Sequence, residues 1–83
     1  HWTMHYVYLI RSIPYPGEKY VGLTRDLPKR LKKHNGGGSP HTAKDKPWEL
    51  ITYIGFGSKA QAAAFETYLK SGSGRAFARK RLW

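Results

Sequence analysis

The spacing of apolar residues at the start of the chain is that of β-strands. The segments His5–Arg11 (HYVYLIR) and Lys19–Leu23 (KYVGL) are both rich in aromatic and β-branched residues, which favour strands. Between them, residues 13–17 hold two prolines and a glycine, and these cannot continue a hydrogen-bonded ladder. Because the connection is short, we expect the two strands to pair as an antiparallel hairpin.

The pattern then changes to that of an amphipathic helix over residues 27–34. Either Asp26 or Thr24 can cap this helix, and Pro28 is tolerated in its first turn. The run Asn-Gly-Gly-Gly at residues 35–38 should end it.

Residues 36–47 are rich in Gly, Ser, Lys and Pro, and we expect a mobile polar loop there. The segment Trp48–Tyr53 (WELITY) predicts a third strand, with Ile54 as its furthest extent. Gly55 and Gly57 should break this strand.

Two helices are predicted in the last third of the chain. The spacing of Ser58 and Gln61 fits a capping box, and the helix that it starts should end before Gly72. Ser73 can cap a further short, basic helix over residues 75–82. The element order is therefore β-β-α-β-α-α, which is an α+β pattern, and we expect the 83 residues to form one domain.

One carboxylate lies close to an apolar stripe. In the helix that begins after Ser58, residues follow one another at about 100°. Ala62, Phe65 and Leu69 therefore share one side, and Glu66 lies roughly 40° from Ala62. A partly desolvated carboxylate needs a partner. In a chain with five acidic and fifteen basic residues, an inward acid favours a bound metal ion and chemistry on a phosphate. The alternative is an ordinary salt bridge between Glu66 and Arg30 or a lysine.

The first helix presents a similar choice. Arg30 and His34 are one turn apart and share the inner side with Leu27 and Leu31. The two cations together favour a pair that faces a phosphate. The alternative is that Arg30 extends to solvent and His34 is a helix-end cation favoured by the helix dipole.

Composition and charge narrow the function classes. The net charge of +10 favours a polyanionic partner, which can be DNA, RNA or an anionic membrane surface. Twelve aromatic residues (three Trp, six Tyr and three Phe) accompany it, and exposed aromatic side chains among cations suit stacking on unpaired bases. The absence of cysteine excludes disulfides and thiolate metal sites. No apolar run reaches the roughly 20 residues that span a bilayer, and no signal peptide is recognisable. We therefore expect a cytoplasmic protein with neither a membrane partner nor a small-molecule substrate. Residues 1–4 are candidates for a tag remnant or a disordered start.

Several short motifs occur in a specific order. They are Tyr6-Val7-Tyr8, Tyr20-Val21-Gly22, then Arg30 and Glu66, with the stretch GLTRDLPKRLKKHN over residues 22–35. In this order the chain resembles the GIY-YIG nuclease family, especially its small stand-alone members, from about Tyr6 to Lys70. Tyr6 replaces the first glycine of the family motif. Leu23 stands where some members carry a lysine.

The resemblance implies a three-stranded antiparallel sheet flanked by helices and the hydrolysis of DNA with one divalent metal, Mg²⁺ or Mn²⁺. By residue, it implies that Tyr8 and Tyr20 are the motif tyrosines, one of them activating water, and that Arg30 stabilises the phosphate. It further implies that His34 assists and that Glu66 is the single metal ligand.

Nucleic-acid contacts are expected from the loop and from the basic residues, with Trp48 or Trp83 available to stack. The candidates are Lys33, His41, Lys44, Arg75 and Arg79. His41 is also a candidate for a further histidine that some family members place in the loop. Single-stranded or structured DNA is a plausible substrate. The main alternative is a nucleic-acid-binding module without catalysis, and a weaker one is association of the 75–83 segment with anionic membranes.

Overall fold

Three strands form one antiparallel sheet in the order β2-β1-β3. Strand β1 spans His5–Ser12, β2 spans Lys19–Thr24 and β3 spans Trp48–Phe56. The register of the hairpin places Tyr8 opposite Gly22. The central strand β1 therefore has a hydrogen-bonded neighbour on each side, and its side chains point to the two faces of the sheet.

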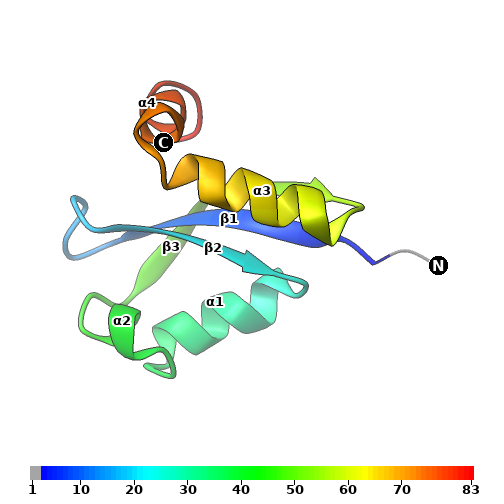
Figure 1. The fold of residues 1–83 in the computed structure, drawn as a ribbon. Coiled ribbons are helices and arrows are strands. Elements are labelled where there is room, and N and C mark those ends of the chain that lie inside the picture. The colour runs from blue at the N-terminus through cyan, green and yellow to red at the C-terminus, as the bar shows by residue number, and fades with distance from the viewer. Residues whose placement is uncertain (1–2) are drawn as a thin grey trace.

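Helices cover both faces of this sheet (Figure 1). Helices α1 (Leu27–Asn35) and α2 (Pro40–Ala43) lie on one face. Helices α3 (Lys59–Leu69) and α4 (Gly72–Arg81) lie on the other. The predicted α+β fold with a three-stranded antiparallel sheet is confirmed. The predicted element order lacked α2, which lies inside the segment expected to be a loop.

Successive side chains of β1 point to opposite faces of the sheet, so the core has two layers. Val7 and Leu9 are fully buried against α3 and α4, in a cluster completed by Ala62, Leu69 and Ala78. Tyr8 and Ile10 point to the opposite face, where they pack with Trp48 and, less deeply, with Tyr20, Leu27 and Leu31. Tyr8 thus points away from Val7 and Leu9, as the period of two residues in a strand requires.

The predicted caps hold two of the helices. The Asp26 side chain accepts a hydrogen bond from the backbone N–H of Lys29 at 3.1 Å, which settles the choice between Asp26 and Thr24. Ser58 accepts a hydrogen bond from the backbone N–H of Gln61 at 3.3 Å. Each cap satisfies a donor that the first turn of a helix leaves free.

The boundary between the last two helices was predicted wrongly. Ser71, not Ser73, caps α4, since its hydroxyl accepts a hydrogen bond from the Gly74 N–H at 3.2 Å. Gly72 is therefore the first residue of α4 rather than only the end of α3. A Cβ at Gly74 would overlap the backbone carbonyl of Tyr68, so α4 turns back directly onto the end of α3.

Strand β3 also continues past its predicted end. Gly55 pairs with Tyr6 in the register between β1 and β3, and a Cβ on Gly55 would lie 3.2 Å from the Tyr6 ring. The glycine thus accommodates an aromatic neighbour and does not end the strand.

The structure describes residues 3–83. The prediction of a tag remnant or disordered start at residues 1–4 falls partly outside the described residues. Within residues 3–83, no helix has both the length and the apolar character needed to cross a bilayer.

Candidate active site

The hydroxyl of Tyr8 lies at the centre of a polar cluster between β1 and α1. Tyr8 is 2% exposed, and its Oη lies 2.9 Å from His34 Nε2. Gly22 makes room for it, because a Cβ at that position would overlap the Tyr8 ring. Burial, followed by the neighbouring Tyr20, raises the pKa of Tyr8 to about 12.

The second ring nitrogen of His34 is also bonded. Its Nδ1 lies 2.8 Å from the hydroxyl of Thr42, and that hydroxyl donates its single hydrogen to the Ser39 carbonyl at 3.4 Å. We assign to His34 the tautomer with its hydrogen on Nδ1, because Thr42 then accepts from Nδ1–H and Nε2 accepts from the Tyr8 hydroxyl, which satisfies every group in the chain. Burial lowers the pKa of His34, and the positive charge of Arg30 lowers it further, which favours the neutral ring.

Thr42 is the residue of this cluster that the sequence did not reveal. It is 1% exposed, and its carbonyl accepts a hydrogen bond from Trp48 Nε1 at 2.9 Å. Asn35 holds the backbone of Trp48 from both sides, since Oδ1 accepts from the Trp48 N–H at 2.5 Å and Nδ2 donates to the Trp48 carbonyl at 3.2 Å. The only local signal was Ser39 followed by Pro40, a cap followed by a proline.

Tyr20 and Arg30 border the same cluster. The ring centroid of Tyr20 lies 5.1 Å from that of His34 and 6.3 Å from that of Tyr8. Arg30 is half-buried on the inner side of α1, and its positive charge lowers the pKa of Tyr8 against the larger effects of burial and Tyr20. The helix spacing that placed Arg30 and His34 on one side therefore brings both to Tyr8.

Glu66 lies on α3, the helix on the opposite face of the sheet, and acts on Tyr8 through its charge. Its negative charge is one of the smaller influences that raise the pKa of Tyr8, after burial and Tyr20. The Glu66 side chain is 23% exposed, and Oε2 accepts a hydrogen bond from Lys70 Nζ at 3.2 Å. The alternative of a salt bridge to a lysine is thus realised through one oxygen. Oε1 has no hydrogen-bond partner among residues 3–83.

Glu66 fits a divalent ion as a lone protein ligand. Within the described part of the chain, no group of three or more His, Cys, Asp or Glu side chains is arranged to hold a metal. Mg²⁺ retains several waters and is commonly bound by one or two carboxylates together with substrate phosphate oxygens. The partly exposed Glu66 carboxylate supplies the hard oxygen donor that such an ion prefers.

Comparison with known families decides the classification. The profile of the GIY-YIG catalytic domain matches residues 4–80. The chain belongs to the GIY-YIG catalytic domain family. Of the five residues that the resemblance implied for a GIY-YIG site, Tyr8, Tyr20, Arg30 and His34 meet in this cluster, and Glu66 acts on Tyr8 through its charge. Their catalytic roles remain predictions.

Curated GIY-YIG relatives are much longer proteins. The chain is 46% identical over 65 residues to the structure-specific endonuclease subunit slx1 of Talaromyces marneffei, a match that covers 71% of the chain and 17% of that protein. It is 41% identical over 71 residues to the structure-specific endonuclease subunit SLX1 of Candida dubliniensis, covering 77% and 25% respectively. The chain thus spans a quarter or less of these two relatives.

A solved structure of similar fold comes from a bacterium. The UPF0213 protein of Bacillus halodurans, determined by solution NMR, superposes with a TM-score of 0.56 at 31% sequence identity. The match covers 93% of this chain and 83% of that one. This agreement supports the arrangement of helices on the sheet described above.

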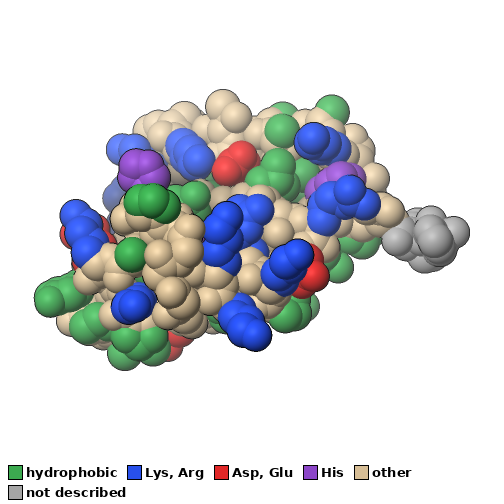
Figure 2. All heavy atoms as spheres, turned by 90° about the horizontal axis from the view of Figure 1, so that it is seen from below, with side chains coloured by type: hydrophobic (Ala, Val, Ile, Leu, Met, Phe, Trp, Pro, Cys, Tyr) green, Lys and Arg blue, Asp and Glu red, His purple; other side chains and the backbone are tan. Residues whose placement is uncertain are grey.

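The predicted nucleic-acid contacts divide between two faces. Lys33 on α1, His41 on α2 and Lys44 after α2 are exposed. The view from below, the side on which α1 and α2 lie in Figure 1, shows many Lys and Arg side chains (Figure 2). Arg75 and Arg79 lie on α4, beyond the opposite face of the sheet. Their contacts with nucleic acid remain predictions.

The two tryptophans proposed for stacking differ in access. Trp48 is 4% exposed and its indole N–H is bonded to Thr42, so the prediction that it is available to stack on a base is wrong. Its aromatic ring is needed in the core beside Tyr8 and Ile10. Trp83 is half-buried, with Lys19 Nζ 5.2 Å from its ring centroid.

Proposed function

We propose that this chain is a metal-dependent endonuclease that hydrolyses phosphodiester bonds of structured DNA. The observation that carries the proposal is the buried Tyr8–His34 hydrogen bond of 2.9 Å, which lies within the electrostatic reach of Arg30 and Glu66. The relatives are structure-specific endonuclease subunits by name, which supports structured DNA as the substrate.

Tyr8 and His34 are proposed to move the proton together. A tyrosine with a pKa of about 12 is a weak base at neutral pH on its own. In a concerted step, the Tyr8 oxygen can accept a proton from the attacking water while its own proton moves to His34 Nε2, so that no free tyrosinate forms beforehand. Both nitrogens of His34 are already bonded, so His34 acts on the substrate only through Tyr8.

The remaining residues supply charge and position. Arg30 is proposed to pair with the non-bridging oxygens of the phosphate, where a guanidinium can donate two parallel hydrogen bonds as negative charge builds up. Tyr20 is the less buried of the two motif tyrosines and is proposed to border the bound phosphate. Glu66 would hold Mg²⁺ or Mn²⁺, and such an ion lowers the pKa of bound water and neutralises phosphate charge.

Substitution of Glu66 tests this proposal. Glu66→Gln keeps the shape of the side chain but removes its charge, and we expect cleavage of branched or flapped DNA in Mg²⁺ to fall by about 100-fold or more. Glu49→Gln is the matched control, because Glu49 is an exposed carboxylate paired with Arg11 at 3.1 Å, on the edge strand β3. Circular dichroism should show both variants folded.

Three outcomes separate the readings. Cleavage lost in Glu66→Gln and in EDTA, but kept in Glu49→Gln, supports the proposal. Full cleavage by Glu66→Gln in Mg²⁺ would rule out its assigned role. Tight DNA binding by the unmodified chain with no cleavage in Mg²⁺ or Mn²⁺ would favour the non-catalytic binding module, for which the +10 charge is equally suited.

A further inference from the structure

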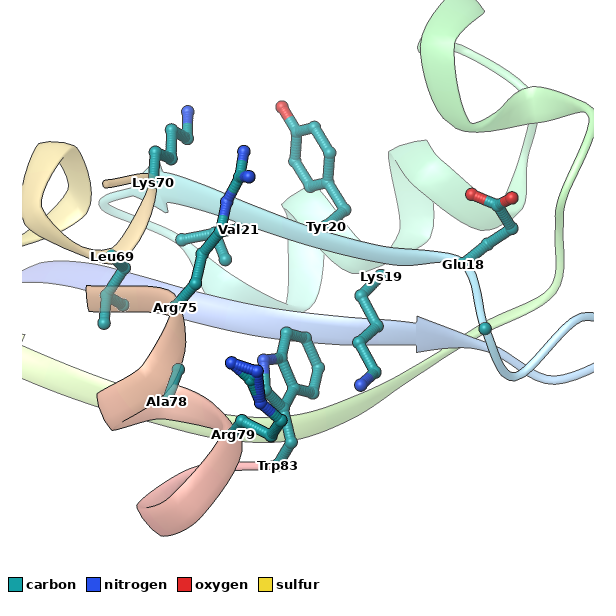
Figure 3. A pocket seen from close by; sticks show the side chains of 11 residues that line it. Glu18, Lys19, Tyr20, Val21, Leu69, Lys70, Arg75, Ala78, Arg79 and Trp83 are labelled. Atoms are coloured by element: carbon teal, nitrogen blue, oxygen red, sulfur yellow. The ribbon is translucent and has the colours of Figure 1, made fainter. Parts of the chain in front are cut away.

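A groove of about 510 Å³ runs between strand β2 and helix α4. Its walls come from the end of the hairpin, the end of α3, one side of α4 and Trp83 (Figure 3). Four basic side chains line it, those of Lys19, Lys70, Arg75 and Arg79, against one acid, Glu18. The groove is therefore suited to an anion.

Two exposed arginines on α4 are positioned to bind an anion. Arg75 and Arg79 are one turn apart on α4 and both are exposed, so they present two guanidinium groups along one side of the helix. Within residues 3–83, neither forms a salt bridge with a carboxylate. Ala78, between them in sequence, is buried in the core, which fixes the side of α4 that the arginines occupy.

One end of the groove is continuous with the candidate active site. Tyr20 lines the groove, and its ring lies 5.1 Å from that of His34. Lys70 also lines it while its Nζ holds Glu66 Oε2 at 3.2 Å. Figure 3 shows the side chains of Tyr20, Lys70 and Arg75 extending to the same side, and Arg79 and Trp83 also line the groove.

We propose that this groove binds the phosphodiester backbone of a single DNA strand that leaves the active site along α4. The direction of that strand rests on the proposed nuclease function, which places the scissile phosphate beside Tyr20. Two arginines one turn apart match the repeated phosphate charges of a DNA strand. Each phosphate that a cation neutralises releases counterions.

The size and the wall of the groove favour one strand over a duplex. Its volume lies within the range of pockets that enclose a small molecule, which suits a short stretch of a single strand. Trp83 forms an apolar wall that packs on the core and carries Lys19 at 5.2 Å over its ring. An aromatic wall beside cations is typical of single-strand binding surfaces.

Paired double variants test the groove. Arg75→Ala/Arg79→Ala removes two charges from the groove, and Lys80→Ala/Arg81→Ala removes two exposed charges from the same helix outside it. Affinity is measured by fluorescence anisotropy in EDTA, over a series of salt concentrations. The probes are a labelled hairpin with a single-stranded flap and the same hairpin with a blunt end.

For the groove variant we expect roughly tenfold weaker binding of the flapped hairpin. The slope of log affinity against log salt concentration should become shallower by about 1.4, which is the value for two phosphate contacts to a single strand. The control variant should change each quantity by less than half as much.

Equal losses of affinity in the two variants would overturn the proposed binding by the groove, because general attraction to positive charge would then explain them. Equal losses by the groove variant on flapped and blunt hairpins would overturn the assignment to a single strand. Because EDTA removes any metal-dependent cleavage, these results stand even if the chain proves not to be a nuclease.

Discussion

The hydrogen bond between Thr42 and His34 gives the sharpest test of the site. Thr42→Val removes the hydroxyl but nearly keeps the volume of a side chain that is 1% exposed. His34 Nδ1–H then loses its partner at 2.8 Å in a place that water does not reach. Thr42→Ser restores the hydroxyl and is the conservative counterpart.

The expected magnitudes follow from this burial. A buried donor without a partner costs about 1–3 kcal/mol, and 1 kcal/mol lowers the Tm of a domain of this size by roughly 4–8 °C. The lost bond also stabilised the tautomer in which Nε2 accepts from Tyr8. If about 1.4 kcal/mol of that preference is lost, we expect kcat for DNA cleavage to fall about tenfold. KM should stay near its original value, because Thr42 is not proposed to contact DNA.

A second threonine supplies the control. Thr52 donates a hydrogen bond of 2.6 Å to the Leu82 carbonyl, so Thr52→Val also loses a threonine hydroxyl that joins two segments of the chain. We expect Thr52→Val to lower the Tm but to leave kcat unchanged at temperatures where the protein is folded. A fall in kcat seen in Thr42→Val, absent in Thr52→Val and reversed in Thr42→Ser cannot come from stability alone.

The tautomer can be read without any activity. In ¹⁵N NMR spectra of the histidine side chains, His34 should show a protonated Nδ1 and an unprotonated Nε2, and Thr42→Val should shift the ring toward a mixture. The reasoning is refuted if the unmodified protein shows Nε2–H, or if Thr42→Val and Thr52→Val have the same kcat.

Three further predictions concern the same cluster. Because the pKa of His34 is lowered by burial and by Arg30, the unfolded chain binds a proton more readily. The free energy of unfolding should therefore fall as pH drops below about 6.5, and His34→Gln should flatten that limb in urea titrations. The pKa of Tyr8 is raised to about 12, so stability should also fall above pH 10, by up to about 3 kcal/mol, and Tyr8→Phe should remove most of that loss. Gly22→Ala should destabilise the fold by about 1–3 kcal/mol and reduce cleavage, since the new Cβ would overlap the Tyr8 ring; thermal melts and cleavage rates like those of the unmodified protein would contradict it.

The sequence predicted where a helix begins when a single capping residue determines it. Ser58 was predicted as a cap and Asp26 was one of two candidates, and both accept a backbone hydrogen bond in the first turn of their helix. Ser71 and Ser73 are equally able to cap a helix by type. The choice between them depends on how closely Gly74 approaches the Tyr68 carbonyl, a tertiary contact that local spacing does not contain.

The candidate site shows the same limit. Helix periodicity placed His34 on the inner side of its helix, and strand alternation placed Tyr8 on one face of the sheet, so their meeting was within reach of the sequence. Thr42 lies in a four-residue helix, which is too short to show a period. Asn35 and Trp48 fix its place through contacts thirteen residues apart in the chain, and nothing in residues 36–47 alone indicates them.

The polar chain from Tyr8 through His34 to Thr42 also bears on how the site works. Burying polar groups in a domain of 83 residues is costly unless every one is bonded. Within the described residues, no buried side-chain nitrogen or oxygen lacks a partner. A fully bonded chain of this kind is rigid, so the Tyr8 hydroxyl is oriented before any substrate binds. In the proposed reaction, the protein then has no reorganisation to complete around Tyr8 when charge develops on the phosphate. The same hydrogen bonds stabilise the layer between β1 and α1. Substitutions of Tyr8, His34 or Thr42 should therefore lower stability and cleavage together, whereas Glu66→Gln should lower cleavage alone.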